Sequence, residues 1–183
     1  MIPMEEEIVK KLEKLSEREI LGYAIASEED AIQFYLKLSE GRGELIAEFF
    51  KDLAKAEQAH KTLLLNLHEN LFGSREYTVP EDVPFAESTV NIVTLGNLVE
   101  ALKTALMNEK TAERVYTLLA KKLPEHRILF DFLAAQERAH YRAIEAHEEY
   151  LEGLMRGKPE YVEAPPHVIF NQVEIYYKPR TQP

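Results

Sequence analysis

The chain has 183 residues, of which 22 are basic and 32 acidic, so its formal net charge is 22 − 32 = −10. This acidic balance, with no basic patch or basic helix face, argues against a nucleic-acid partner and against binding to an anionic membrane surface. The sequence contains no cysteine. That excludes disulfides, thiolate zinc sites, cysteine-ligated iron–sulfur clusters and cysteine catalysis.

The N-terminal segment and the hydropathy pattern predict a cytoplasmic protein. The first residues, MIPMEEEIVKK, are acidic and lack the apolar core of a secretory signal. Uninterrupted apolar runs extend over only a few residues, whereas a transmembrane helix needs about 20. The length is also sufficient to bury a sizeable core as one domain.

An amphipathic lead-in and a first long helix are predicted at the start of the chain. The lead-in covers residues 4–15, and we expect the acidic run at 5–7 to be solvated at the beginning of its helix. Ser16 and Glu19 have the spacing of a capping box. The apolar period that follows predicts a helix over about 17–40.

A second long helix and a long connection come next. The tripeptide at 41–43, Gly-Arg-Gly, separates the second helix from the first. This helix is predicted to run to about Phe72, because Gly73 suits the left-handed position after a helix end. Residues 73–93 contain two prolines and many turn formers, so we expect a long connection there.

Two further long helices and a tail complete the chain. A third helix is predicted over about 95–121, and a fourth over about 124–155, with Pro124 in its first turn. Prolines become frequent in 158–183 and flank a β-prone stretch at 168–177. We expect this segment to be an extended tail, possibly forming a strand, that packs on the helices or on a partner.

The lengths of the links predict the topology. Short links join the first helix to the second and the third to the fourth, so each pair should form an antiparallel hairpin. The central connection of about 20 residues is long enough to cross a bundle from end to end. The expected fold is an all-α four-helix bundle of two hairpins with one long crossover, covering residues 1–157.

The two halves of the chain repeat one pattern. A shift of 80 residues places LAKAEQAH at 53–60 on LAAQERAH at 133–140. A shift of 81 residues places AIASEEDAIQFY at 24–35 on ALMNEKTAERVY at 105–116. Hairpins built on the same pattern are expected to pack with approximate two-fold symmetry.

Six acidic or imidazole side chains interrupt the apolar stripes that should face the core: Glu28, Glu57, His60, Glu109, Glu137 and His140. In the second and fourth helices a histidine follows a glutamate by three residues, on the same helix face. One such Glu-x-x-His pair is expected by chance in so glutamate-rich a chain. Two pairs in register within a repeat, each preceded by a stripe glutamate, are not.

The energetics of these six residues predict a metal site. A buried, unpaired carboxylate costs several kcal/mol or takes up a proton. Two divalent cations would neutralise the four carboxylates and use all six side chains as ligands. Oxygen-rich ligation with one imidazole per metal suits iron or manganese, and the absence of thiolates disfavours a structural zinc site. The ligand set is that of di-iron carboxylate bundles.

The pattern ExxAxxxY followed by ExxH, present twice within residues 16–155, resembles the rubrerythrin branch of the ferritin-like superfamily. The resemblance implies that Glu57 and Glu137 bridge two iron ions. It assigns the remaining ligands as one pair to each metal, Glu28 with His60 and Glu109 with His140. These six residues would also form the catalytic centre.

The same resemblance implies a role for two tyrosines and shows two departures. Tyr35 and Tyr116 would lie behind the metal ligands and hydrogen-bond their carboxylates. Full-length rubrerythrins carry a cysteine-ligated rubredoxin domain, which this chain lacks, so a separate rubredoxin-like donor protein is expected. Rubrerythrins also have a further glutamate where this chain has Ala112, with Glu113 about 100° around the helix. This departure argues against the family's redox-linked metal shift, and hence against efficient peroxidase activity.

The other histidines and glutamates of interest are expected to be structural or solvated. His147 lies on the fourth stripe but aligns with Leu67, so we expect a core histidine whose hydrogen bonds are satisfied. A surface position is expected for the remaining histidines, His68, His126 and His167. Three glutamates should face solvent, namely Glu29, Glu100 and Glu113.

The leading functional hypothesis is a non-haem di-iron oxidoreductase that reduces hydrogen peroxide or dioxygen. One alternative is a ferroxidase that oxidises iron and passes it on, with or without storage. A di-manganese catalase uses a similar ligand pattern, and a non-enzymatic, metal-stabilised scaffold is the third alternative. Bundles of this kind often pair, so a homodimer is expected.

Overall fold

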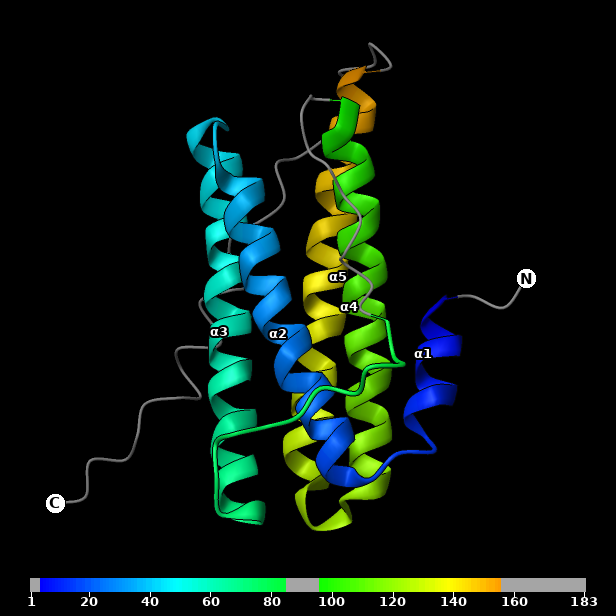
Figure 1. The fold of residues 1–183 in the computed structure, drawn as a ribbon. Coiled ribbons are helices and arrows are strands. Elements are labelled where there is room, and N and C mark those ends of the chain that lie inside the picture. The colour runs from blue at the N-terminus through cyan, green and yellow to red at the C-terminus, as the bar shows by residue number, and fades with distance from the viewer. Residues whose placement is uncertain (1–3, 85–95, 156–183) are drawn as a thin grey trace, which may run out of the picture.

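The computed structural model describes residues 4–84 and 96–155 (Figure 1). Within these ranges the regular elements are helices: α1 (Met4–Leu12), α2 (Glu17–Ser39), α3 (Glu44–Phe72), α4 (Gly96–Lys122), a 3₁₀ turn (Pro124–His126) and α5 (Arg127–Met155). The predicted all-α class is therefore confirmed, with helix ends close to those expected. The predicted tail at 158–183 lies outside the described residues.

Local sequence signals define the ends of the long helices. The Ser16 side chain accepts a hydrogen bond from the Glu19 N–H at 3.3 Å, and Glu19 Oε2 accepts one from the Ser16 N–H at 2.9 Å. This is the predicted capping box. Gly73 ends α3 with φ 73°, a left-handed conformation that costs glycine little. Pro124 begins the 3₁₀ turn, so α5 itself starts three residues later than expected.

The four long helices form two hairpins that pack against each other. Helix α2 packs on α3, α4 packs on α5, and the hairpins meet chiefly through α2 and α4 (Figure 1). Helix α1 packs against α4 through the fully buried Ile8 and Leu12. This is the predicted four-helix bundle of two antiparallel hairpins. Among the described helices there is none with the length and hydrophobicity to span a bilayer.

The beginning of the crossover packs tightly over α2. An ideal Cβ on Gly22 would lie 2.2 Å from the carbonyl oxygen of Thr78. The Tyr23 hydroxyl donates to the Pro84 carbonyl at 3.0 Å, and Val83 is buried. The position of α2 therefore depends on a close backbone approach that only glycine permits.

Substitution Gly22→Ala is expected to destabilise the protein by about 1–3 kcal/mol, the usual cost of overpacking. Alanine normally favours a helix interior by up to about 1 kcal/mol over glycine, but here the contacted atom belongs to the backbone and cannot rotate away. Chemical denaturation measures the change. Gly43→Ser is the matched control, since a Cβ at Gly43 meets no atom within 4 Å and serine is favoured at this N-cap. Equal stabilities of Gly22→Ala and wild type would contradict the close approach.

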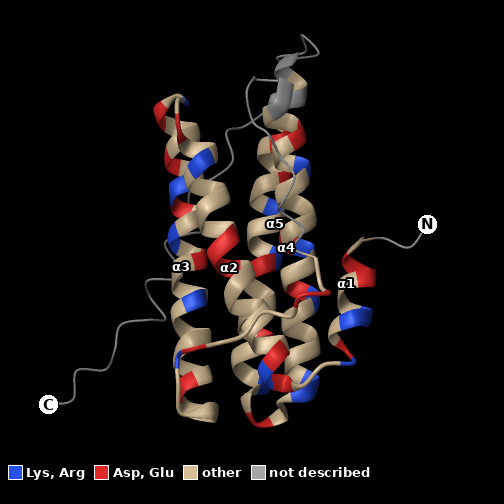
Figure 2. Cartoon of the chain, in the orientation of Figure 1, with Lys and Arg blue, Asp and Glu red and all other residues tan. Residues whose placement is uncertain are grey.

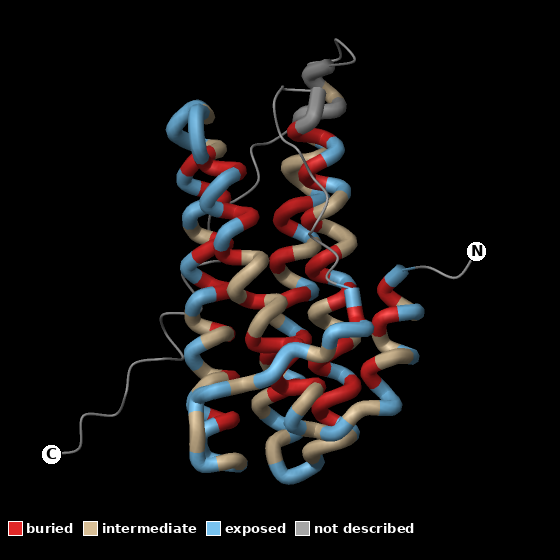
Figure 3. Tube along the Cα trace, viewed as in Figure 1, coloured by how far each residue is buried: buried red, intermediate tan, exposed pale blue. Residues whose placement is uncertain are grey.

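The apolar core is divided by a polar layer. One cluster of buried residues includes Leu21, Leu64 and Phe130, and a second includes Leu38, Phe50 and Ile144. Buried positions follow the inner faces of the helices along their length (Figure 3). Charged residues of both signs occupy the outer faces, and acidic residues also occur at mid-height, where the helices face one another (Figure 2). The candidate site lies in this layer.

Two expectations about surface residues are wrong. Glu5, in the acidic run of α1, is only 7% exposed and pairs with Lys110 of α4 at 3.0 Å. Burial opposes ionisation, but the Lys110 ammonium lowers the pKa of this carboxyl overall. His68 is fully buried, with Nδ1 2.6 Å from the carbonyl oxygen of Ser74, because the chain folds back after α3. His126 is half-buried, and His167 lies outside the described residues.

Candidate metal centre

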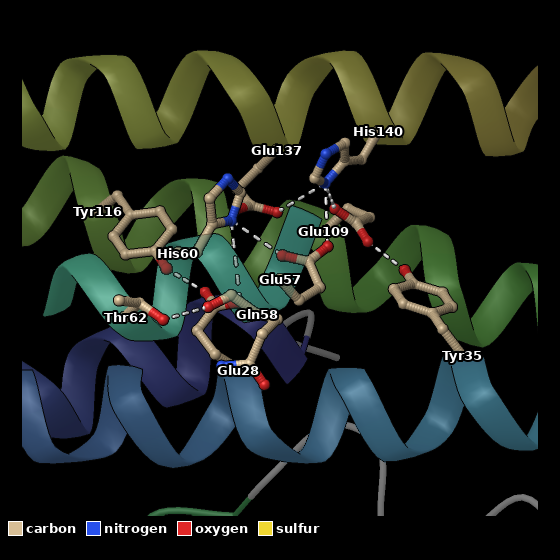
Figure 4. A network of polar contacts seen from close by, with 10 residues as sticks. All are labelled: Glu28, Tyr35, Glu57, Gln58, His60, Thr62, Glu109, Tyr116, Glu137 and His140. Atoms are coloured by element: carbon tan, nitrogen blue, oxygen red, sulfur yellow. Dashed lines mark hydrogen bonds and ion pairs between the residues drawn. The ribbon is translucent and has the colours of Figure 1, made fainter. Parts of the chain in front are cut away.

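All six predicted site residues converge at mid-height between the four long helices (Figure 4). Each is at most 3% exposed. Their ligand atoms form two groups, in each of which the atoms lie within 4.8 Å of one another: Glu28, Glu57, His60 and Glu137 in the first, and Glu57, Glu109, Glu137 and His140 in the second. The groups share the two central glutamates that were expected to bridge.

Each central glutamate directs one carboxylate oxygen toward His60 and the other toward His140. His60 Nδ1 lies 2.9 Å from Glu57 Oε2 and 2.9 Å from Glu137 Oε1. His140 Nδ1 lies 3.0 Å from the other oxygen of Glu57 and 3.5 Å from the other oxygen of Glu137. The two imidazole rings lie 5.5 Å apart at an interplanar angle of 19°. Each central carboxylate can therefore serve two neighbouring ions at once.

Helical periodicity accounts for this convergence. On α3 and α5 the glutamate and the histidine three residues later share one face. That face is the continuation of the apolar stripe, so packing of the neighbouring Leu53 and Leu133 turns the polar pair inward as well. Glu28 extends from α2 into the group that contains His60. Glu109 extends from α4 into the group that contains His140 (Figure 4).

The two predicted tyrosines connect the hairpins reciprocally. The Tyr35 hydroxyl on α2 donates to Glu109 Oε1 on α4, and the Tyr116 hydroxyl on α4 donates to Glu28 Oε1 on α2. Both tyrosines are 1% exposed. Burial first, and then the charge of Glu28, raise the pKa of the Tyr116 hydroxyl, which therefore remains a proton donor.

Substitution Tyr116→Phe is expected to weaken one metal-binding step about tenfold and leave the other nearly unchanged, because only Glu28 loses its hydrogen-bond donor. Tyr35→Phe should do the same to the step that involves Glu109. Calorimetric titration with Mn(II) resolves the two steps. Tyr77→Phe, in the crossover, is the control. Equal weakening of both steps by either variant would contradict the assignment of one tyrosine to one ion.

The protonation pattern of the cluster follows from its charges. Burial, and then the charges of Glu57 and Glu137, raise the pKa of the Glu28 carboxyl well above its ordinary value, and Glu109 is raised for the same reasons. Burial would lower the pKa of His60, but the two central carboxylates raise it to about 9. Burial would also lower the pKa of His140, but Glu57, and then Glu109 and Glu137, raise it well above its ordinary value.

The central carboxylates shift the other way, because the imidazolium charges outweigh the effect of burial. The pKa of Glu57 and that of Glu137 are both lowered by His60 and His140. In the cluster without metal these shifts favour protons on the outer glutamates and the imidazoles and a negative charge on the central carboxylates, so the opposite charges largely offset one another.

The residues present fit two divalent cations. As metal ligands, the six side chains are four carboxylates and two neutral imidazoles. Two divalent ions then restore neutrality at 4 − 4 = 0. Both oxygens of Glu57, both nitrogens of His60 and one oxygen of Glu137 are buried without a hydrogen bond of normal geometry to any described residue. Such groups are costly unless a ligand occupies them.

Residues next to the cluster do not add ligands. Glu113 pairs with Arg138 at 2.7 Å and Glu29 pairs with Lys61, while Glu100 is exposed. The His147 ring stacks on Phe49 at 3.6 Å, and its Nδ1 lies 2.9 Å from the Ala143 carbonyl. The histidine is therefore structural, as expected, and these glutamates lie toward solvent.

The sequence reasoning missed a pocket that opens onto the cluster. Its cavity volume is about 40 Å³, and its walls come from α2 and α4. Glu28, Glu57, Glu109 and Glu137 also line it, whereas the two histidines do not. Asn108, Ser27 and Ala112 are among the wall residues. Asn108 and Ser27 each precede a candidate ligand by one residue, but only the packing of α2 on α4 shows that they share a cavity.

A crossover four-helix bundle with a buried cluster of four carboxylates and two imidazoles defines the class of ferritin-like proteins with a candidate dinuclear metal centre. The family model described as Rubrerythrin matches residues 19–148, so the chain belongs to the rubrerythrin family. The chain is also similar to a hypothetical protein from Pyrococcus furiosus, with 28% identity and a TM-score of 0.72, over 80% of this chain and 96% of that one. The curated proteins searched contain no match.

Proposed function

We propose that the protein is a non-haem di-iron oxidoreductase that reduces hydrogen peroxide or dioxygen with electrons from an external donor. The observation that supports this most directly is the arrangement of Glu57 and Glu137. In each of these glutamates one oxygen lies near one of the two site histidines and the other oxygen lies near the second. A purely structural site needs only one ion, and therefore needs no glutamates whose two oxygens can bind different ions. The adjoining pocket also gives a small molecule access to the four carboxylates.

Two iron ions would be held in the two overlapping groups of side chains. When bound, they supply two electrons, one from each Fe(II), with which hydrogen peroxide and two protons yield two water molecules. Tyr116 and Tyr35 keep the outer glutamates oriented by donating to them. The surrounding apolar clusters exclude bulk water, which strengthens the electrostatic interactions within the site.

Anaerobic reconstitution with Fe(II) tests the proposal. Two ions per chain are expected, followed by a change in absorption when the reduced protein meets hydrogen peroxide or dioxygen in a stopped-flow instrument. Indifference to both oxidants would contradict an oxidase and a peroxidase alike. Reconstitution with Mn(II) is the parallel arm, and rapid oxygen evolution from peroxide by that form alone would favour a catalase.

The donor and the assembly state are part of the same proposal. Because the chain has no cysteine, it cannot hold the iron of a rubredoxin domain, and we expect a separate rubredoxin-like protein to return the electrons. We also expect a homodimer. Light scattering distinguishes a dimer from a many-subunit iron-storage cage, and turnover with added rubredoxin tests the donor.

A further inference from the structure

One polar side chain in the pocket has no role in the proposed metal centre. Asn108 is 8% exposed, and neither its amide nitrogen nor its amide oxygen has a hydrogen-bond partner among the described residues. An unsatisfied buried amide costs about 1–3 kcal/mol. The neighbouring Thr111 differs, because its hydroxyl donates to the Met107 carbonyl at 2.8 Å.

The position of Asn108 relates it to the candidate ligands. It immediately precedes Glu109 on α4, and both side chains line the same cavity. The repeat aligns it with Ser27 of α2, which immediately precedes Glu28, so the pocket is lined by an amide from α4 and a smaller hydroxyl from α2. Any molecule that enters between α2 and α4 meets this amide beside the four carboxylates.

The size of the pocket suits a small molecule. Its volume of about 40 Å³ holds a few water-sized groups, so a molecule of two heavy atoms fits. The methyl group of Ala112 also lines this cavity.

We propose that Asn108 is a positioning residue that selects hydrogen peroxide over dioxygen, an inference that rests on the proposed function. A primary amide both donates and accepts hydrogen bonds, and so does hydrogen peroxide. Dioxygen has no proton to donate and accepts only weakly. Hydrogen peroxide can therefore satisfy both the donor and the acceptor of the Asn108 amide.

The test compares Asn108→Leu with wild type in two measurements. In single-turnover stopped-flow of the Fe(II)-loaded proteins, the rate with hydrogen peroxide should fall about tenfold, as for one lost hydrogen bond, while the rate with dioxygen stays within about threefold. In the metal-free proteins, the melting temperature of Asn108→Leu should stay within about 3 °C of wild type or rise, because an apolar isostere leaves no unsatisfied group. Thr104→Val is the control, one turn away on α4 with its hydroxyl on the Glu100 carbonyl.

Each outcome decides the matter. An unchanged ratio of the two rates in Asn108→Leu overturns the role of Asn108 and leaves the proposed function intact. A clear drop in the metal-free melting temperature assigns the amide a structural role instead. Wild-type protein that reacts with neither oxidant overturns the proposed function and this inference together.

Discussion

Substitution Glu57→Gln is expected to reduce the metal content from two ions per chain to fewer than one. Glu57 belongs to both ligand groups, and its two oxygens face different histidines. A glutamine offers one neutral oxygen and an amide nitrogen that does not bind these metals. We expect the affinity for both ions to fall at least about 100-fold, beyond the usual effect of changing a supporting residue. Metal analysis after anaerobic equilibrium dialysis measures both quantities.

Without metal, the variant lacks one of the two carboxylates that pair with His60 and His140, so its metal-free melting temperature is expected to fall below that of wild type. Its circular dichroism spectrum, recorded below that melting temperature, shows that the protein on which metal is measured is folded. Glu137→Gln should behave in the same way because the two central glutamates are equivalent in the structure. Glu100→Gln, at an exposed position of α4, is the control for loss of one charge. A Glu57→Gln protein that retains two ions per chain would contradict the bridging arrangement.

Removal of both metal ions is expected to lower the melting temperature by about 10–20 °C. Each ion, at a free concentration about 100 times its dissociation constant, adds about 2.7 kcal/mol to the free energy of unfolding. Two ions add roughly 5 kcal/mol, and in a chain of this size each kcal/mol corresponds to about 2–4 °C. Differential scanning calorimetry of Mn(II)-loaded and chelator-treated protein measures the difference.

The effect of metal removal should also grow as the pH rises. The folded state raises the pKa of His60 to about 9, so this group's contribution to stability is complete below its unfolded pKa of 6.5 and is lost as the pH approaches 9. The raised pKa values of His140, Glu28 and Glu109 act in the same direction. The lowered pKa of Glu57 contributes stability that is lost only in acid. Without metal, the protein should therefore be less stable at pH 8.5 than at pH 6.

The affinity for metal is expected to increase as the pH rises, because binding releases the protons that the cluster holds. We expect protons to be released from the outer glutamates and from the imidazoles. Calorimetry in buffers of different ionisation enthalpy counts them. A difference in melting temperature between loaded and metal-free protein that shrinks from pH 6 to pH 8.5 would contradict these protonation states.

Much of the fold and the cluster could be predicted because both depend on helical periodicity. The stripes that predicted α2 to α5 also determine which side chains reach the interior, so a glutamate on a stripe had to be buried. Capping by Ser16 and the left-handed Gly73 are equally local, and both are visible in the sequence. The sequence predicted that Tyr35 hydrogen-bonds a ligand carboxylate, but it did not identify Glu109 as the partner, because Glu109 lies on the other hairpin.

Other features depend on contacts between helices, which periodicity does not specify. Glu5 was expected in solvent because it starts an acidic run, but Lys110 is brought next to it by the packing of α1 on α4. His68 is buried by the chain that turns back after Gly73. Asn108 lies off the main stripe of α4, and its burial follows from how closely α2 approaches.

The crossover has a consequence for how the two sides of the site can diverge. Each hairpin supplies two glutamates and one histidine, so two identical hairpins around a true two-fold axis would carry the same six ligands. In such a dimer every residue at the entrance would occur twice. A single chain removes that constraint, and its halves can keep identical ligands while differing around them. Asn108, which aligns with Ser27 in the repeat, is such a difference, and covalent linkage of the hairpins permits different chemistry on the two sides of a ligand set that is itself symmetric.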